Sequence, residues 1–521
     1  MPSYSYILKG GTIVDGSGFP MARGDLGISG ETIKAVGDVG RGSAARVIDA
    51  SGKYVMPGMI DIANHSDTHW TLFNYPSQEN LLRQGITTIV GGICGVSLAP
   101  LADSRAIRAI EKWADTSSAN INWRSFEEYA RELERHEIGV NAGSFIGYTT
   151  LRHNIAGDES RDLTHSELES MKLMLTRSLD EGALGLSINL SLPSRQEEIA
   201  ALSKVVADAG KLVVMHLKNE GRKLLQAVIE AISIARLSGA AIHISHFKGI
   251  GKKAWQELPK AMSIIRKVGK EENISITMDF FPYLRTGSLL MSFLPEWILD
   301  GGIDEAKAII ADQSKRGHVL ETLKGLTLHY DNIVIAEAKK DKHSIGKTLA
   351  DIAASTGLQP EEAMVHMLAV NDFGVSVFSK TLRSRDVVQI AREPFAMLGS
   401  DGVGEPKGRR DLTHPRSYGT APRFIVRFVK RSKIFTWEEA VKKMTSMPAE
   451  RLGIDVNRGL LKKGHFADVV VVDPVSIRDR STYKEPFVYP DGIEYVFVNG
   501  RLAVEKNNFT GALAGKVLRR A

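Results

Sequence analysis

Four residues that can bind a metal or move a proton each stand directly after an apolar run. They are Cys94, His216, His246 and Asp401. The runs that precede them are 87–93, 211–215, 241–245 and 395–400. Side chains at the C-terminal ends of strands form the active site of a (β/α)₈ barrel, so this repeated placement predicts an α/β barrel with the four groups at one mouth. One thiolate and two imidazoles are donors that suit Zn²⁺, with a position left for water.

The two histidines are separated by one complete strand–helix–strand unit. The spacing of apolar residues predicts a helix over 222–238, between the two strands. Consecutive parallel strands lie side by side, so we expect His216 and His246 on one rim, close enough to share an ion. His243 lies on the other face of its strand and is predicted to be structural. Asp401, in Gly-Ser-Asp-Gly, is either a turn residue or, opposite a metal, the general base.

Length and composition indicate a globular protein of more than one domain. The chain has 521 residues, of which 43% are apolar and 25% charged, and it has one cysteine. A single cysteine cannot form an internal disulfide, and the N-terminus lacks the basic and apolar regions of a secretory signal, so we expect a cytoplasmic protein. No run of ~18 uncharged apolar residues predicts a membrane span. The net charge of +6 is scattered, which argues against a nucleic-acid partner and suits a small anionic substrate.

Both ends of the chain have a pattern of short predicted strands separated by glycine turns. The pattern covers residues 1–56. Near the C-terminus a strand is predicted at 467–473 and a hairpin over 495–504, with Asn499-Gly500 at the turn. The simplest interpretation is one small β domain assembled from both ends. The predicted domains are therefore a β-sandwich from 1–56 and 456–521 and a barrel over 57–455.

One segment of the barrel region, 287–340, fits the alternation of strands and helices poorly. It begins with apolar residues and continues as a charged helical pattern. We interpret it as an insertion over the barrel mouth, a candidate lid. The alternative is an ordinary barrel helix with a long loop.

Several motifs resemble the N-acyl-D-amino-acid deacylases (D-aminoacylases) of the amidohydrolase superfamily, over nearly the whole chain. The matching segments are Pro57-Gly-Met-Ile-Asp61, Gln84-Gly-Ile-Thr-Thr-Ile-Val90, Cys94-Gly-Val-Ser-Leu-Ala-Pro100, Met215-His-Leu-Lys-Asn-Glu220, Ile244-Ser-His-Phe-Lys248, Gly399-Ser-Asp-Gly402 and His414-Pro-Arg416. The resemblance implies a metal-bearing barrel beside a split β-sandwich. It also implies hydrolysis of the amide bond of N-acyl-D-amino acids, which are small-molecule substrates.

The same resemblance assigns roles to individual residues. Cys94, His216 and His246 would bind a tightly held zinc ion, and Asp401 would activate the hydrolytic water. The positions that match those holding the substrate carboxylate are Lys248, Tyr283 and Arg416. Arginine offers a planar fork for a carboxylate and lysine adds a point charge, so the assignment is chemically reasonable.

One departure from the family pattern concerns a second metal. Amidohydrolases usually carry His-x-His after the first barrel strand, whereas this chain has Ala63-Asn64-His65. His65 is thus a ligand for a weak second site only, and we expect about one zinc per chain. Asp67 and His69 lie nearby but out of register. Tyr148, where many relatives have a histidine, indicates an altered fit to substrate.

Two other functions stay open at this stage. A cyclic-amide hydrolase of the hydantoinase or dihydroorotase kind would need an intact His-x-His and a lysine on a mid-barrel strand, and the strand at 184–188 has no lysine. A binding protein that lost catalysis together with the first histidine is the other alternative. Retention of Cys94, His216, His246 and Asp401 argues against it. The sequence leaves the oligomeric state undecided.

Overall fold

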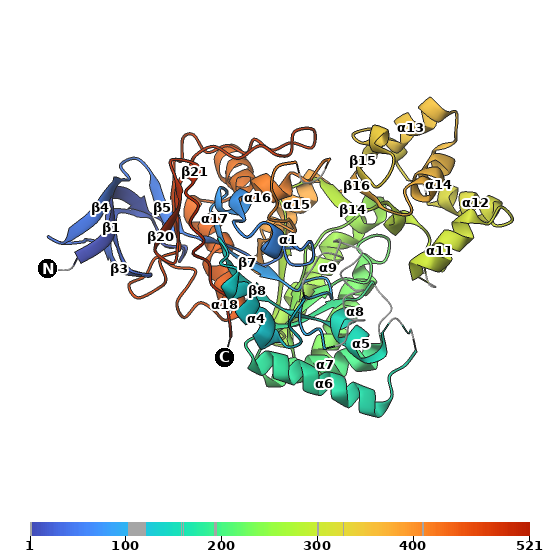
Figure 1. Ribbon diagram of the computed structural model, residues 1–521, viewed down its shortest axis with the longest axis horizontal. Coiled ribbons are helices and arrows are strands. Elements are labelled where there is room, and N and C mark those ends of the chain that lie inside the picture. The colour runs from blue at the N-terminus through green and yellow to red at the C-terminus, as the bar shows by residue number, and fades with distance from the viewer. Residues whose placement is uncertain are drawn as a thin grey trace.

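A computed structural model shows a mixed α/β protein with three regions in a row (Figure 1). The structure describes residues 3–102, 121–157, 159, 161–191, 195–299, 302–326, 328–408 and 411–520. A sheet built from both chain ends lies on the left of Figure 1, a central α/β region follows, and a lobe of helices and a small sheet lies on the right. None of the helices within these described ranges has the length and apolar character needed to cross a bilayer.

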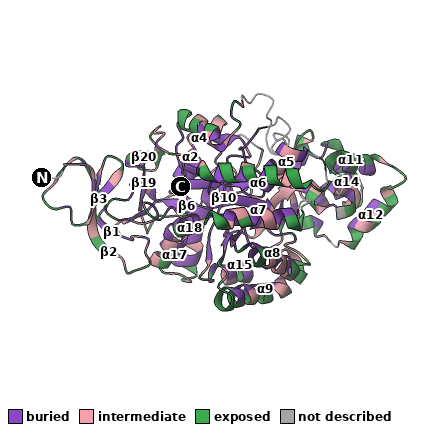
Figure 2. Ribbon diagram, turned by 90° about the horizontal axis from the view of Figure 1, so that it is seen from below, coloured by how far each residue is buried: buried purple, intermediate pink, exposed green. Residues whose placement is uncertain are grey.

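The central region contains two parallel sheets whose strands are almost wholly buried. The first sheet contains β6 (Met59–Asp61), β7 (Ile86–Gly91) and β8 (Asn141–Ser144). The second contains β9 (Ile146–Gly147), β10 (Gly185–Asn189), β11 (Leu212–His216), β12 (Ala241–Ile244), β13 (Ile276–Phe280) and β17 (Ala396–Leu398). Continuous apolar strands of this kind need cover on both faces, which is why helices surround them. Figure 2 shows this buried centre under helices with exposed outer faces.

Backbone bonds connect the two sheets at both junctions. The Asp401 amide donates to the Ala63 carbonyl at 2.9 Å, and the His65 amide to the Gly402 carbonyl at 2.9 Å, so the end of β6 lies beside the end of β17. At the other junction, β8 runs into β9 after one residue, and Leu184 N donates to Ser144 O at 3.0 Å. The C-terminal ends of the strands, where the predicted site residues stand, therefore gather on one side.

Helices cover the central strands, and two local sequence predictions are confirmed, one for a helix and one for a hairpin. The predicted helix at 222–238 is α8 (Leu224–Ser238), which ends at Gly239 in the left-handed conformation. The others before the lobe are α1 (Thr71–Asn74), α2 (Glu79–Leu82), α4 (Phe126–Arg135), α5 (Tyr148–Ala156), α6 (His165–Asp180), α7 (Gln196–Asp208) and α9 (Gly251–Glu271). Those after it are α15 (Ser384–Ala391), α16 (Arg416–Phe424), the π-helix η5 (Ile425–Arg431), α17 (Trp437–Met444) and α18 (Ser446–Leu452). The hairpin with Asn499-Gly500 at its turn also forms, because Val498 pairs with Arg501.

The strands at the two chain ends form one nine-stranded sheet. It runs β21-β20-β19-β18-β5-β1-β2-β3, with β4 beside β1. The strands are β1 (Ser3–Ile13), β2 (Ala22–Ser29), β3 (Thr32–Gly37), β4 (Ser43–Asp49), β5 (Tyr54–Pro57), β18 (Val469–Val472), β19 (Ile493–Val498), β20 (Arg501–Glu505) and β21 (Asn508–Phe509). β5 pairs with β1 on one side and with β18 on the other, so it joins the two ends. Leu8, Val55 and Phe497 belong to one shared apolar core.

The lobe is larger than the insertion that the sequence predicts at 287–340. Its antiparallel sheet has the order β14-β16-β15 and spans residues 285–380. The elements are β14 (Arg285–Leu289), η2 (Leu290–Phe293), α10 (Glu296–Leu299), α11 (Gly302–Ala311), α12 (Arg316–Gly325), η3 (Tyr330–Asn332), β15 (Ile333–Ala338), η4 (Lys342–Ser344), α13 (Leu349–Thr356), α14 (Pro360–Val370) and β16 (Val375–Lys380). The lobe has its own apolar core. β16 belongs to the lobe, because it pairs antiparallel with β14 and β15 and contributes Val375 and Val377 to the core of the lobe.

A buried carboxylate, Asp61, links the end of β6 to the end of β17. It accepts hydrogen bonds from Ser400 N at 2.8 Å, Ser400 Oγ at 2.5 Å and Asn64 Nδ2 at 2.9 Å. Burial raises the pKa of Asp61 to about 6, although these bonds favour the ionised form. Asp61 thus fixes the backbone next to Asp401.

Replacement of Asp61 by alanine should destabilise the protein. The change leaves buried donors on Ser400 and Asn64 unpaired, and each such group costs about 1–3 kcal/mol. We expect the free energy of unfolding in urea to fall by at least about 2 kcal/mol. Asp304→Ala, at an exposed position on α11, is the control and should leave it unchanged. Equal stability of the two variants would show that Asp61 does not hold this junction.

Candidate metal centre

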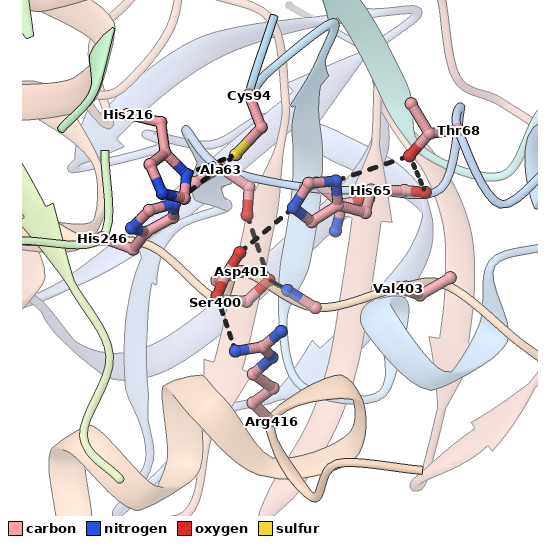
Figure 3. A network of polar contacts seen from close by, with 12 residues as sticks. Ala63, His65, Thr68, Cys94, His216, His246, Ser400, Asp401, Val403 and Arg416 are labelled. Carbon is pink, nitrogen blue, oxygen red and sulfur yellow. Dashed lines mark hydrogen bonds and ion pairs between the residues drawn. The ribbon is translucent and has the colours of Figure 1, made fainter. Parts of the chain in front are cut away.

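The three predicted metal ligands meet at the C-terminal ends of the central strands. Cys94 follows β7, His216 ends β11 and His246 follows β12. Cys94 Sγ lies 3.5 Å from His216 Nδ1 and 3.4 Å from His246 Nε2, and the three ligand atoms all lie within 4.8 Å of one another (Figure 3). Within the described part of the chain, this is the one group of three or more histidine, cysteine, aspartate or glutamate side chains with such spacing.

The backbone at three site residues has an unusual conformation. Cys94, His246 and Asp401 have φ angles of 54°, 39° and 51°, in the left-handed region. Residues other than glycine seldom adopt it, and it costs of order 1–3 kcal/mol where the structure enforces it. Gly92 shows how crowded the turn before Cys94 is, because a Cβ there would lie 2.0 Å from the Phe145 carbonyl oxygen. These turns set the direction in which each side chain leaves its strand.

The donor set fits a zinc ion. Burial alone would raise the pKa of the Cys94 thiol, but the positive charge of His246 and a hydrogen bond with His216 outweigh it and hold that pKa well below its usual range. The thiolate is the form that binds metals. One thiolate and two imidazoles are zinc donors, and three protein ligands leave a fourth position for water or substrate.

His65 and Asp401 form a pair next to these ligands. His65 Nε2 lies 3.1 Å from Asp401 Oδ1, and Asp401 and Cys94 together raise the pKa of His65 to about 10 despite burial. Ala63 is fully buried, in an apolar cluster with Ile60 and Val90. The position where the family pattern has its first histidine is thus filled by a methyl group, and His65 is engaged with Asp401.

Within the part of the chain that the structure describes, neither Asp67 nor His69 completes a second group of three ligands around His65. The Asp67 carboxylate accepts a hydrogen bond from Gly92 N at 2.5 Å, so it supports the backbone that leads to Cys94. The His69 ring centroid lies 6.3 Å from that of His65.

Arg416 approaches Asp401 from the side opposite the metal ligands, as Figure 3 shows. It is the first residue of α16, and its NH1 donates to Asp401 Oδ2 at 2.6 Å. Burial would raise the pKa of Asp401, but Arg416 and His246 hold it well below its usual range. Asp401 is therefore ionised at neutral pH and can accept a proton.

Of the other predicted substrate contacts, Lys248 lies beside a metal ligand and Tyr283 lies beside the residue before Arg416. Lys248 Nζ donates to Glu220 Oε1 at 2.5 Å and lies 2.8 Å from His246 Nδ1. Tyr283 is fully buried, and its hydroxyl donates to the Pro415 carbonyl at 3.1 Å, directly before Arg416. Their contact with substrate stays a prediction.

Three further residues, His243, Tyr148 and Glu220, have defined partners in the structure. His243 bonds to Thr277 and Asp279 and is buried, as expected of a structural residue. The hydroxyl of Tyr148 donates to Glu198 Oε2 at 2.6 Å, which engages it with helix α7. Sequence reasoning missed Glu220, which contacts both His246 and Lys248. The one sequence feature that could have pointed to Glu220 is its position four residues after His216, within a segment that resembles the family.

Comparison with known proteins gives one consistent result. A model of an amidohydrolase family matches residues 46–309 and 350–504. The chain is 30% identical to a D-aminoacylase of Alcaligenes xylosoxydans xylosoxydans over 99% of this chain and 98% of the relative. It is 29% identical to an N-acyl-D-glutamate deacylase of Bordetella bronchiseptica solved with zinc and a phosphonate inhibitor, with a TM-score of 0.84 over 100% of both chains. A D-aminoacylase structure with a binuclear metal centre, where one metal activates and the second attenuates, is also 29% identical, with a TM-score of 0.84 over 99% of this chain and 100% of that one.

Removal of a ligand should release the metal. We expect Cys94→Ala to weaken zinc binding by more than the roughly 10–100-fold that loss of an outer partner costs, because it removes the anionic donor. Elemental analysis after dialysis measures this. His318→Ala, at an exposed position on α12, is the control and should retain zinc. Zinc retained by Cys94→Ala would place the ion elsewhere.

Proposed function

The chain belongs to the amidohydrolase family, and on this basis we propose that it hydrolyses the amide bond of N-acyl-D-amino acids to a D-amino acid and a carboxylate. The observation that carries the proposal is the placement of Cys94, His216 and His246 around one point. The ionised Asp401 lies next to this group, and Arg416 contacts Asp401 from the other side. A metal site, a base and a cation for a carboxylate are the three parts that this reaction needs.

We infer that the ion is zinc and that each chain holds about one. A bound zinc ion would polarise the acyl carbonyl and lower the pKa of water towards ~7. Cys94, His216 and His246 would hold it. The number follows from Ala63, which lacks a donor, and from His65, whose Nε2 faces Asp401 at 3.1 Å. Elemental analysis should give about one equivalent after dialysis, and two tightly held ions would contradict the inference.

Asp401 would act as the base and then as the acid. Its carboxylate takes a proton from the attacking water, and the same carboxyl group gives that proton to the amine nitrogen as the amide bond breaks. His65 on one oxygen and Arg416 on the other keep the carboxylate in place. Both partners favour the ionised form, which is the form needed at the start.

Arg416 would hold the substrate carboxylate, with Lys248 as a second cation. Tyr283 would act through its bond to the Pro415 carbonyl, which fixes the backbone before Arg416. With the carboxylate held at one side and the amide at the metal, the two enantiomers differ in where they place the side chain of the α-carbon, so its surroundings would select between them.

For the architecture, we propose that the central parallel strands, with β8 and β9 counted as one, close into a (β/α)₈ barrel over 57–455. We also propose that the nine-stranded sheet from 1–56 and 456–521 folds over on itself as a β-sandwich. The lobe over 285–380 would act as a lid. Two contacts between the lobe and the loop before Arg416 support this role. His414 Nε2 lies 3.0 Å from the Arg285 carbonyl, and Lys342 Nζ lies 2.6 Å from Asp411 Oδ2. We also propose a reducing compartment, the cytoplasm, because Cys94 must stay a free thiolate.

The alternatives are less well supported. A cyclic-amide hydrolase of the hydantoinase kind would need a lysine on a mid-barrel strand, and β10 has the sequence Gly-Leu-Ser-Ile-Asn. An inactive binding protein would have no need for an ionised Asp401 beside a complete set of three ligands. Turnover of hydantoin or dihydropyrimidine rings, with no turnover of linear N-acyl amino acids, would favour the first alternative.

Asp401→Asn should keep the metal and lose turnover. The amide cannot accept the proton of the attacking water, and a positioned acid–base group contributes about 10²–10⁴-fold to rate. We expect kcat to fall by at least about 100-fold with unchanged zinc content. Asp372→Asn, at an exposed position, serves as the control. An active Asp401→Asn variant would point to another base, such as His65.

Arg416→Ala should lower kcat for every substrate, because Arg416 also holds Asp401, and should raise KM selectively for substrates with a free carboxylate. A charge-assisted hydrogen bond to a buried group is worth about 1.5–3 kcal/mol, so KM for substrates with a free α-carboxylate should rise about ten- to a hundredfold. KM for substrates with a blocked carboxylate should change much less. Arg416→Lys should be intermediate, because lysine lacks the planar fork. An equal change in KM for free and blocked substrates would make Arg416 a structural residue.

A further inference from the structure

The loop between β11 and α8 carries a glutamate that the proposed reaction does not use. Glu220 is mostly buried, with 12% of its side chain exposed. Its backbone carbonyl accepts a hydrogen bond from Ile250 N at 2.7 Å, which ties this loop to the segment after β12. Glu220 is therefore held in place from its main chain as well as through its side chain.

The side chain of Glu220 meets one metal ligand and one lysine at a single oxygen. Glu220 Oε1 lies 3.0 Å from His246 Nδ1 and 2.5 Å from Lys248 Nζ. Lys248 Nζ in turn lies 2.8 Å from His246 Nδ1. The three groups form a triangle on the side of His246 that faces away from Cys94.

The chemistry of this triangle decides where the proton of His246 resides. His246 Nε2 faces Cys94 Sγ at 3.4 Å, so it can bind a metal there only with a free lone pair. Neutral imidazole must then carry its proton on Nδ1 and needs an acceptor for it. An ammonium group has only donors, whereas a carboxylate has only acceptors, so Glu220 can serve and Lys248 cannot.

Without Glu220 the same geometry would favour the wrong tautomer. Lys248 would donate to Nδ1, and the remaining proton would stand on Nε2, directed at Cys94. The His246 backbone is fixed separately, since its amide donates to Asp279 Oδ1 at 3.0 Å. Asp279 thus holds the main chain, and the orientation of the ring depends on Glu220.

We propose that Glu220 is a positioning residue that keeps His246 in the tautomer able to bind the metal, against competition from Lys248. The inference rests on the proposed function in one respect, namely that Cys94, His216 and His246 hold an ion. Carboxylates that accept from the second nitrogen of a ligating histidine raise its basicity and fix its orientation, and their loss typically costs 10–100-fold in metal affinity.

The test measures metal affinity directly. Zinc dissociation constants are obtained for the full chain by competition with a chelating dye, and Co²⁺ spectra report the thiolate and imidazole ligands. Glu220→Ala should weaken zinc binding by about 10–100-fold and alter the Co²⁺ spectrum. Glu220→Gln should be milder, because the amide oxygen can still accept from Nδ1. Glu230→Gln, an acidic residue on α8 with 29% of its side chain exposed, is the control.

A double variant distinguishes tautomer control from general damage. Adding Lys248→Met to Glu220→Ala removes the competing donor, so part of the lost zinc affinity should return. Equal zinc affinity in wild type, Glu220→Ala and Glu230→Gln would overturn the inference alone. A loss with Glu220→Ala that Lys248→Met does not lessen would also overturn it. A wild-type chain that binds no metal at Cys94 would overturn the proposed function, and this inference with it.

Discussion

The site depends on one interaction that occurs three times. In each case the side chain of a buried aspartate accepts a hydrogen bond from a backbone N–H group near the end of a strand, where the chain enters the left-handed region. Asp61 binds Ser400 N beside Asp401, Asp67 binds Gly92 N before Cys94, and Asp279 binds His246 N. The turning residues have positive φ angles, which are unfavourable for side chains with a Cβ. The carboxylates supply fixed acceptors that make such turns stable. Two metal ligands and the proposed base therefore depend on buried charges that do not touch substrate.

The same architecture explains how two cations and two carboxylates can coexist in a small volume. Asp401 lies between His65 and Arg416, and Glu220 lies between His246 and Lys248. Asp401 and Glu220 thus each have two nitrogen partners, which offsets much of the cost of removing these carboxylates from water. The fully buried Ala63 is consistent with this arrangement. A second metal would need His65 as a ligand, whereas here His65 contacts Asp401.

The chemistry at strand ends could be predicted from sequence because parallel strands place consecutive ends on one edge. Cys94, His216, His246 and Asp401 were found in this way, and helix α8 and the Asn499-Gly500 hairpin followed from local signals. The extent of the lobe could not be predicted, because antiparallel pairing of β16 with β14 and β15 is a long-range contact. The two partners of Glu220 could not be predicted either. An acidic residue in a loop is expected to be exposed to solvent, and only the folded structure shows Lys248 and His246 next to it.

We propose that N-acyl-D-amino acids are hydrolysed at the site of Cys94, His216 and His246. This is tested by kcat/KM of the zinc-loaded protein for matched N-acetyl-D- and N-acetyl-L-amino acids, with and without a chelator. We expect release of acetate from the D enantiomers, little from the L enantiomers, and loss of activity on chelation that zinc restores. Equal turnover of both enantiomers, or activity indifferent to the chelator, would contradict it.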